Sequence, residues 1–153
     1  MAGADRQASP LRWAGLIFLG MLLFTAATWF AFFWFVTGPL CGNQVVQELP
    51  SPGAPLVAVV FRRDCGATTA VSTQLSILAR GATLQNRAGN AFVADSNHGA
   101  APESADGGPE LRVEWTGAKN LRVVHDPRAR VFQSKTHVSG VDIVYEPAQP
   151  DAP

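Results

Sequence analysis

The sequence predicts a mainly β protein, in which one N-terminal transmembrane helix is followed by a small antiparallel β-sandwich or partly open barrel. Three observations support this prediction. Residues 13–36 form an apolar run without a charged side chain. Beyond it, apolar and polar residues alternate with a period of two, which is typical of half-buried strands. No helical period follows residue 36, and turn residues separate about seven short strands.

The apolar run is long enough to cross a bilayer. As a helix it would span roughly 36 Å, against a hydrocarbon core of about 30 Å. Trp13 and Trp34 would mark the two interfaces, and Gly38-Pro39 would end the helix. A cleaved signal peptide and lipid attachment at Cys41 are alternatives. The first normally has a shorter apolar region and a small-residue cleavage site. The second normally has a small residue where Leu40 stands, so we favour an uncleaved anchor.

Charges flanking the run predict its orientation. Arg6 and Arg12 precede it, whereas the next positive charge after it is Arg62. By the positive-inside rule, residues 1–12 lie in the cytoplasm and the C-terminal domain lies in the periplasm. The Ala-, Gly- and Arg-rich, Lys-poor composition is typical of GC-rich bacteria, so we expect a single-pass protein of the bacterial inner membrane. The lipid bilayer is then its first partner.

The remainder divides into three parts. We expect a linker with a short strand (44–49) over residues 37–55, a β-rich extracytoplasmic domain over residues 56–146, and a disordered tail over residues 147–153. The run at residues 56–61 is apolar on both faces, as in a buried central strand. Residues 62–67 are predicted to form a hairpin turn and residues 96–109 a mobile loop. The domain strands are expected at residues 56–61, 71–79, 91–94, 111–115, 121–123, 131–132 and 141–145.

The chain contains two cysteines, Cys41 and Cys65. In an oxidising compartment an even cysteine count favours a disulfide over two free thiols. If residues 44–49 pair beside residues 56–61, the chain doubles back and brings Cys41 toward Cys65. A Cα separation of about 4.4–6.8 Å then becomes reachable. The two cysteines lack the C-x-x-C spacing of a zinc site.

Several short motifs stand out along the chain: Ser51-Pro52-Gly53, Asp64-Cys65-Gly66-Ala67-Thr68-Thr69, Ser76-Ile77-Leu78, Val113-x-Trp115 and Leu121-x-Val123. The first is close to the S-P-D-G motif that opens a strand pair in many bacterial β-proteins, but it lacks the Asp. Together these motifs resemble those of a group of small, uncharacterised bacterial proteins, which have a membrane or lipid anchor and a short β-domain with a G-A-T-T turn and a later tryptophan strand. The resemblance covers roughly residues 41–145 in scattered motifs and implies an architecture without an activity.

The most distinctive polar feature is the turn that contains Asp64, Thr68 and Thr69. These side chains would present oxygens to a ligand or partner. In the structural interpretation, Gly66 supplies a positive φ and the Thr hydroxyls bond to nearby backbone groups. We favour the structural interpretation because such turns are common.

The remaining candidate residues do not predict a metal or cofactor site. His98, His125 and His137 lack the spacing of a ligand set and are expected to be solvated loop residues. Trp115 with Tyr145 and Phe61 would make a ligand platform, but its alternation with Leu111 and Val113 favours core packing. On the helix, Ala27 and Ala31 form one small-xxx-small pair. An ordinary aromatic belt is the simpler interpretation of that segment.

Two functional hypotheses follow. The first is a non-enzymatic interaction or accessory module for a partner protein of the envelope, held at the membrane. The second is a small hydrolase or ligand-binding domain built on Asp64, Thr68, Thr69 and His125, which would require these groups to converge. The formal net charge is zero, and without a basic face we expect no nucleic-acid partner.

Overall fold

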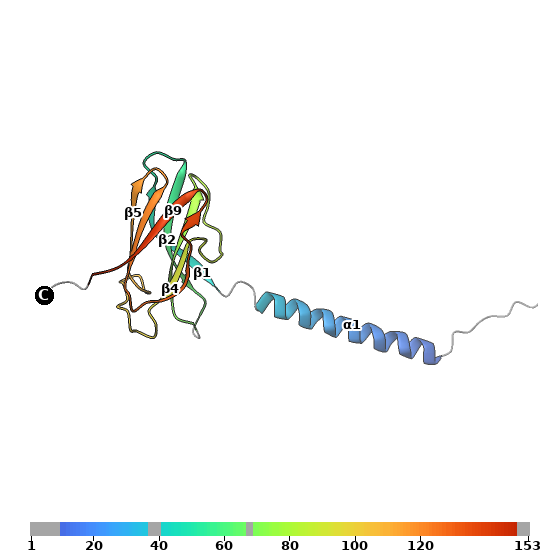
Figure 1. Ribbon diagram of the computed structural model, residues 1–153. Helices are drawn as coiled ribbons and strands as arrows, with labels where there is room; N and C mark the ends of the chain where they lie inside the picture. The colour runs from blue at the N-terminus through green and yellow to red at the C-terminus, as the bar shows by residue number, and fades with distance from the viewer. Residues whose placement is uncertain (1–9, 37–40, 67–68, 150–153) are drawn as a thin grey trace, which may run out of the picture. The chain divides into compact units, whose positions relative to one another are not determined.

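A computed structural model describes residues 10–36, 41–66 and 69–149, and the side chains of residues 13–33 within the helix. The chain divides into two compact units, an N-terminal helix and a β domain (Figure 1). Helix α1 covers Pro10–Val36. Its segment Trp13–Phe33 is long and apolar enough to cross a membrane. The predicted interface marker Trp34 and the predicted helix stop at Gly38-Pro39 lie outside the described side chains and residues.

The two hydroxyls in the middle of α1 do not break its apolar character. Thr25 Oγ1 donates to the carbonyl oxygen of Met21 at 2.9 Å. Thr28 Oγ1 donates to that of Phe24 at 2.7 Å. Because each hydroxyl is satisfied one turn back within the helix, neither requires water. The segment Trp13–Phe33 therefore keeps the length and composition of a membrane span.

The β domain has two sheets, which confirms the predicted mainly β fold as a sandwich. The first sheet has the strand order β1-β2-β3-β4-β7 and the second has the order β5-β6-β9-β8. The strands are β1 Gly42–Pro50, β2 Leu56–Asp64, β3 Ser72–Ala79, β4 Phe92–Asp95, β5 Leu111–Gly117, β6 Asn120–His125, β7 Arg130–Ser134, β8 His137–Val138 and β9 Val141–Pro147.

The strand pairing on which the predicted disulfide depends is present. Strand β1 pairs antiparallel with β2, from Gly42 opposite Asp64 to Pro50 opposite Val57. The predicted linker strand is thus the edge strand of the first sheet. Strand β2 lies between β1 and β3, and residues 57–61 are buried throughout. This burial explains why the run is apolar on both faces.

One strand pair departs from the antiparallel pattern. Strands β6 and β9 run parallel, with Leu121 opposite Ile143 and Val123 opposite Tyr145. The connection between them contains β7, which joins the first sheet, and β8, which forms a short antiparallel pair with β9. Because the chain crosses to the other sheet and back, β9 re-enters beside β6 in the same direction. Alternation alone does not encode this direction.

The core lies between the two sheets and draws side chains from both. Apolar residues that alternate along β2, β3, β5, β6 and β9 point into it, as the period of two requires. Half-buried Trp115 and Tyr145 pack against its margin. The buried members are Ala58, Val60, Leu75, Ile77, Ala91, Phe92, Ala94, Val113, Leu121, Val123, Val141 and Ile143.

Two sequence predictions need correction at their boundaries. Strand β2 continues through Arg62 and Arg63 to Asp64, so the predicted turn over residues 62–67 begins later. The guanidinium of Arg63 donates to the Oδ1 atoms of Asn43 and Asn86, at 2.6 and 3.1 Å. The polar residues Arg62, Arg63 and Asp64 are therefore part of strand β2. Pro147 belongs to β9 and not to the tail, of which residues 150–153 lie outside the described part.

The predicted loop over residues 96–109 contains one isolated bridge, between Glu103 and Pro109. Ser96 and Ala101 are almost fully buried, and Thr73 Oγ1 donates to the carbonyl of Pro109 at 2.7 Å. The segment is therefore a loop packed onto the first sheet. Its mobility stays a prediction.

Candidate functional site

The turn after β2 is held by its own polar groups. Asp64 Oδ1 accepts a hydrogen bond from the Gly66 amide at 2.9 Å. The Thr69 hydroxyl and amide both donate to the Gly66 carbonyl, at 3.2 and 3.1 Å. Gly66 has a φ of 92°, as the structural interpretation of this turn predicts. Thr68 lies outside the described residues. The described contacts of Asp64 and Thr69 are thus those of a turn.

The predicted disulfide is present in the structure. Cys41 and Cys65 are bonded across a sequence separation of 24 residues, with a Cα–Cα distance of 3.8 Å. This distance is shorter than the range we expected from sequence. Nearby, Asn86 Nδ2 donates to the carbonyl of Cys41 at 2.7 Å. The disulfide and this bond both hold the start of β1, the point at which the chain enters the domain.

The three histidines have different surroundings. His98 is exposed in the loop after β4, whereas the His125 ring packs 5.4 Å from that of Phe92, centroid to centroid. His137 Nδ1 lies 2.7 Å from Asp142 Oδ1 at the surface. Over residues 10–36, 41–66 and 69–149, no group of three or more His, Cys, Asp or Glu side chains is arranged to hold a metal ion.

The proposed aromatic platform does not form. Trp115 and Tyr145 pack against the core between the sheets, whereas Phe61 is buried in a second cluster with Val57 and Val59. The Tyr145 hydroxyl lies 2.9 Å from the carbonyl oxygen of Lys135. Burial raises the pKa of Tyr145 to about 12, so this phenol stays protonated at neutral pH. These aromatic groups are structural.

A polar cluster closes the end of β4. Asp95 is 4% exposed and is bound by both Nε and Nη2 of Arg130. Burial would raise the pKa of Asp95. The hydrogen bonds from Arg130 and from the Asn97 amide outweigh it, so that the pKa lies below its ordinary value. The Arg130 guanidinium also lies 4.9 Å from the ring centroid of Phe132. This cluster fixes β7 against β4.

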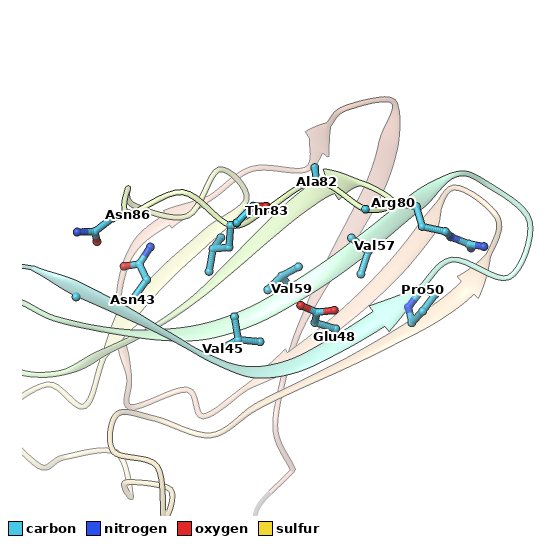
Figure 2. Close-up of a pocket in the computed structure, with 13 residues that line it drawn as sticks. Asn43, Val45, Glu48, Pro50, Val57, Val59, Arg80, Ala82, Thr83 and Asn86 are labelled. Atoms are coloured by element: carbon cyan, nitrogen blue, oxygen red, sulfur yellow. The ribbon is translucent and has the colours of Figure 1, made fainter.

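The structure contains a groove that sequence reasoning missed. It has a volume of about 740 Å³ and lies on the outer face of the first sheet, between β1 and the segment after β3. Figure 2 shows Val45, Val59 and Glu48 on its β1–β2 side and Thr83 on the opposite side. The outward apolar residues of β2 were a signal for it, because a sheet face open to water would carry polar residues there.

The segment over residues 80–90 builds the far side of the groove. Asn43 Nδ2 donates to the carbonyls of Gln85 and Arg87, at 3.0 and 2.8 Å. Asn90 donates to the Ile77 carbonyl at 2.9 Å and accepts from the Ile77 amide at 2.8 Å. These bonds attach the middle of the segment to β1 and its end to β3. The groove between the segment and β1 is therefore a built feature of the fold.

Comparison of the chain with models of protein families, with curated proteins and with solved structures finds no match.

Proposed function

We propose that this chain is a non-enzymatic interaction module, tethered to the bacterial inner membrane, whose periplasmic domain binds a partner protein of the cell envelope. One observation carries this proposal. A single apolar helix is followed, after only residues 37–40, by a β-sandwich that is closed at its entry by a disulfide. The resemblance to small bacterial membrane-anchored β-domain proteins favours the same architecture.

The disulfide and the N-terminal charges both support an extracytoplasmic position of the domain. Disulfides persist in oxidising compartments and are rare in the cytosol, so the Cys41–Cys65 bond favours an extracytoplasmic domain. The N-terminal Arg6 and Arg12 favour the same orientation. The polar groups of the Asp64–Thr69 turn that the structure describes are hydrogen-bonded within it. We therefore propose binding and not hydrolysis.

Chemical cross-linking in intact cells tests this proposal. A full chain tagged after Pro153 should give a discrete adduct, larger than the 16.3 kDa monomer, that is recovered from detergent-solubilised membranes. The matched control carries residues 1–40 and the same tag, and should not give that adduct. Recovery of monomer alone, or of the same adducts from both chains, would contradict a partner bound by the domain.

A further inference from the structure

The edges of both sheets are poorly suited to strand addition. Irregular pairing that adds a residue interrupts β1 between Val45 and Gln47, β7 opposite Val93 and Ala94, and β5 between Trp115 and Gly117. The fourth edge strand of the described sheets, β8, has two residues. Bulges and very short strands are the usual devices that block edge-to-edge pairing. A partner is therefore expected on a face of the domain.

The groove on the first sheet supplies such a face. Val57 and Val59 project from β2 beneath the groove and are almost fully buried there, with 7% and 2% of their surface exposed. Val45 remains 44% exposed beside them. Ala82 and Leu84 add apolar surface on the far side. The groove follows β1 from Gly42 to Pro50, so it fits an extended segment better than a compact ligand.

An unpaired carboxylate lies at the centre of this apolar surface. Glu48 is opposite Val59 in the β1–β2 register and its carboxylate is directed into the groove (Figure 2). Within the described residues it has no hydrogen-bond or ion-pair partner. The other charged residue of the groove, Arg80, donates to the carbonyls of Ser51 and Ala54 at 2.9 and 3.3 Å. Glu48 is thus the one charged side chain of the groove that lacks a hydrogen-bond or ion-pair partner among the described residues.

We propose that the groove binds an extended segment of the partner in which one Lys or Arg is flanked by β-branched apolar residues. The cation pairs with Glu48, and the apolar side chains cover Val45 and the exposed part of Leu84. A charge-assisted hydrogen bond to Glu48 supplies specificity that the apolar contacts lack. This inference rests on the proposed function, because it names the chemistry of the partner bound by the domain.

Peptide titration of the full chain in detergent micelles tests the proposal. The probes are the capped pentapeptides Ser-Val-Lys-Val-Ser and Ser-Val-Glu-Val-Ser, followed by amide chemical shifts. The Lys peptide should give saturable shifts at Val45, Val59 and Thr83. Its affinity should fall about tenfold in Glu48→Gln and should be unchanged in the control Glu114→Gln. Glu114 is on the other sheet and pairs with Arg122 at 3.4 Å.

Equal affinity for the two peptides, or shifts confined to the second sheet, would overturn the proposal. A second variant, Thr83→Trp, fills the groove from an exposed position and should abolish both the peptide shifts and the adduct in cells. If the adduct survives in Thr83→Trp, the groove assignment fails while the proposed function stands. If the unaltered chain gives no adduct, the proposed function fails.

Discussion

Trp115 connects the two sheets through its ring and through its indole nitrogen. The ring packs against the core between the sheets, and Nε1 donates to the carbonyl of Leu49 in β1 at 2.8 Å. The sequence predicts core packing for this residue from its alternation with Leu111 and Val113. The structure adds the hydrogen bond, which depends on a contact between residues that are 66 positions apart. Sequence alternation carries no information on such a pairing.

Substitution of Trp115 separates these two contributions. Trp115→Phe keeps most of the packing and loses the bond to Leu49, so we expect a loss of about 1 kcal/mol in the free energy of unfolding. Trp115→Ala also removes half-buried ring surface and should cost roughly 2–4 kcal/mol. Chemical denaturation followed by circular dichroism measures both. An unchanged midpoint in Trp115→Ala would show that the ring does not contribute to the core.

Asp95 makes the stability of the domain depend on pH. Its pKa is lower in the folded state than its ordinary value, because bonds from Arg130 and the Asn97 amide outweigh burial. The ionised form therefore favours folding. This contribution is complete above the unfolded pKa of about 3.9 and is lost as the pH falls through the lower folded pKa.

We predict that Asp95→Asn lowers the melting temperature more at pH 7 than at pH 3. The difference should shrink because the stability that the ionised carboxylate contributes begins to fall once the pH drops below the unfolded pKa of about 3.9. The control is Asp106→Asn, which alters an exposed loop carboxylate and should leave the melting temperature unchanged. An equal effect of Asp95→Asn at both pH values would contradict the role of the ionised carboxylate.

For the strands, the alternation of apolar and polar residues predicted their positions in the chain better than it predicted which strands pair and in which direction. The expected strands at residues 44–49, 111–115 and 141–145 lie within β1, β5 and β9. In β5 and β9 buried and exposed residues alternate, whereas β1 is exposed except for half-buried Asn43 and Leu49. Strand β8 escaped prediction since two residues cannot show a period. The parallel direction of β9 escaped because it depends on the crossing of the preceding chain between sheets.

The groove escaped prediction for a related reason. Val45 and Thr83 line it from segments far apart in the sequence, and nothing in either segment specifies the other. The attachment of residues 80–90 depends on side-chain amides, such as Asn90 bound to both backbone groups of Ile77. Asn residues in a loop are ordinarily signs of a turn. Only the structure distinguishes this cross-strand role.

The Cys41–Cys65 bond fixes the first hairpin at its open end. We predict that non-reducing mass spectrometry of protein from membranes finds the two cysteines linked. The double variant Cys41→Ser with Cys65→Ser should lose roughly 3 kcal/mol in the free energy of unfolding, the chain-entropy value for a loop of this length. The β1–β2 hydrogen bonds remain, so the fold itself should persist.

Two results would contradict this prediction. Two alkylatable thiols in protein taken directly from membranes would show that the bond does not form in the cell, and would weaken the extracytoplasmic assignment. Equal stability of the unaltered chain with and without reductant would show that the bond does not constrain the unfolded chain.

For the whole molecule, anchoring and folding use separate parts of the chain. The helix is apolar throughout Trp13–Phe33, and the domain has its own core between its sheets. Over the described residues, each buried side-chain nitrogen or oxygen has a hydrogen-bond partner. The domain thus needs neither the helix nor a ligand to satisfy its polar interior. The length and composition of the helix are those of a membrane span.

The charges that flank the helix predict the topology of the chain. Arg6 and Arg12 precede the helix and no positive charge follows until Arg62, so insertion should leave the N-terminus in the cytoplasm. Alkaline phosphatase fused after Pro153 should therefore be active, since it folds only where its own disulfides form. The fusion should stay in the pellet after a carbonate wash.

The control exchanges the flanking charges, with Arg6→Glu, Arg12→Glu and Thr37→Arg, and should reduce the reporter activity. A silent fusion in the unaltered chain would reverse the proposed orientation, and release by carbonate would rule out an uncleaved anchor.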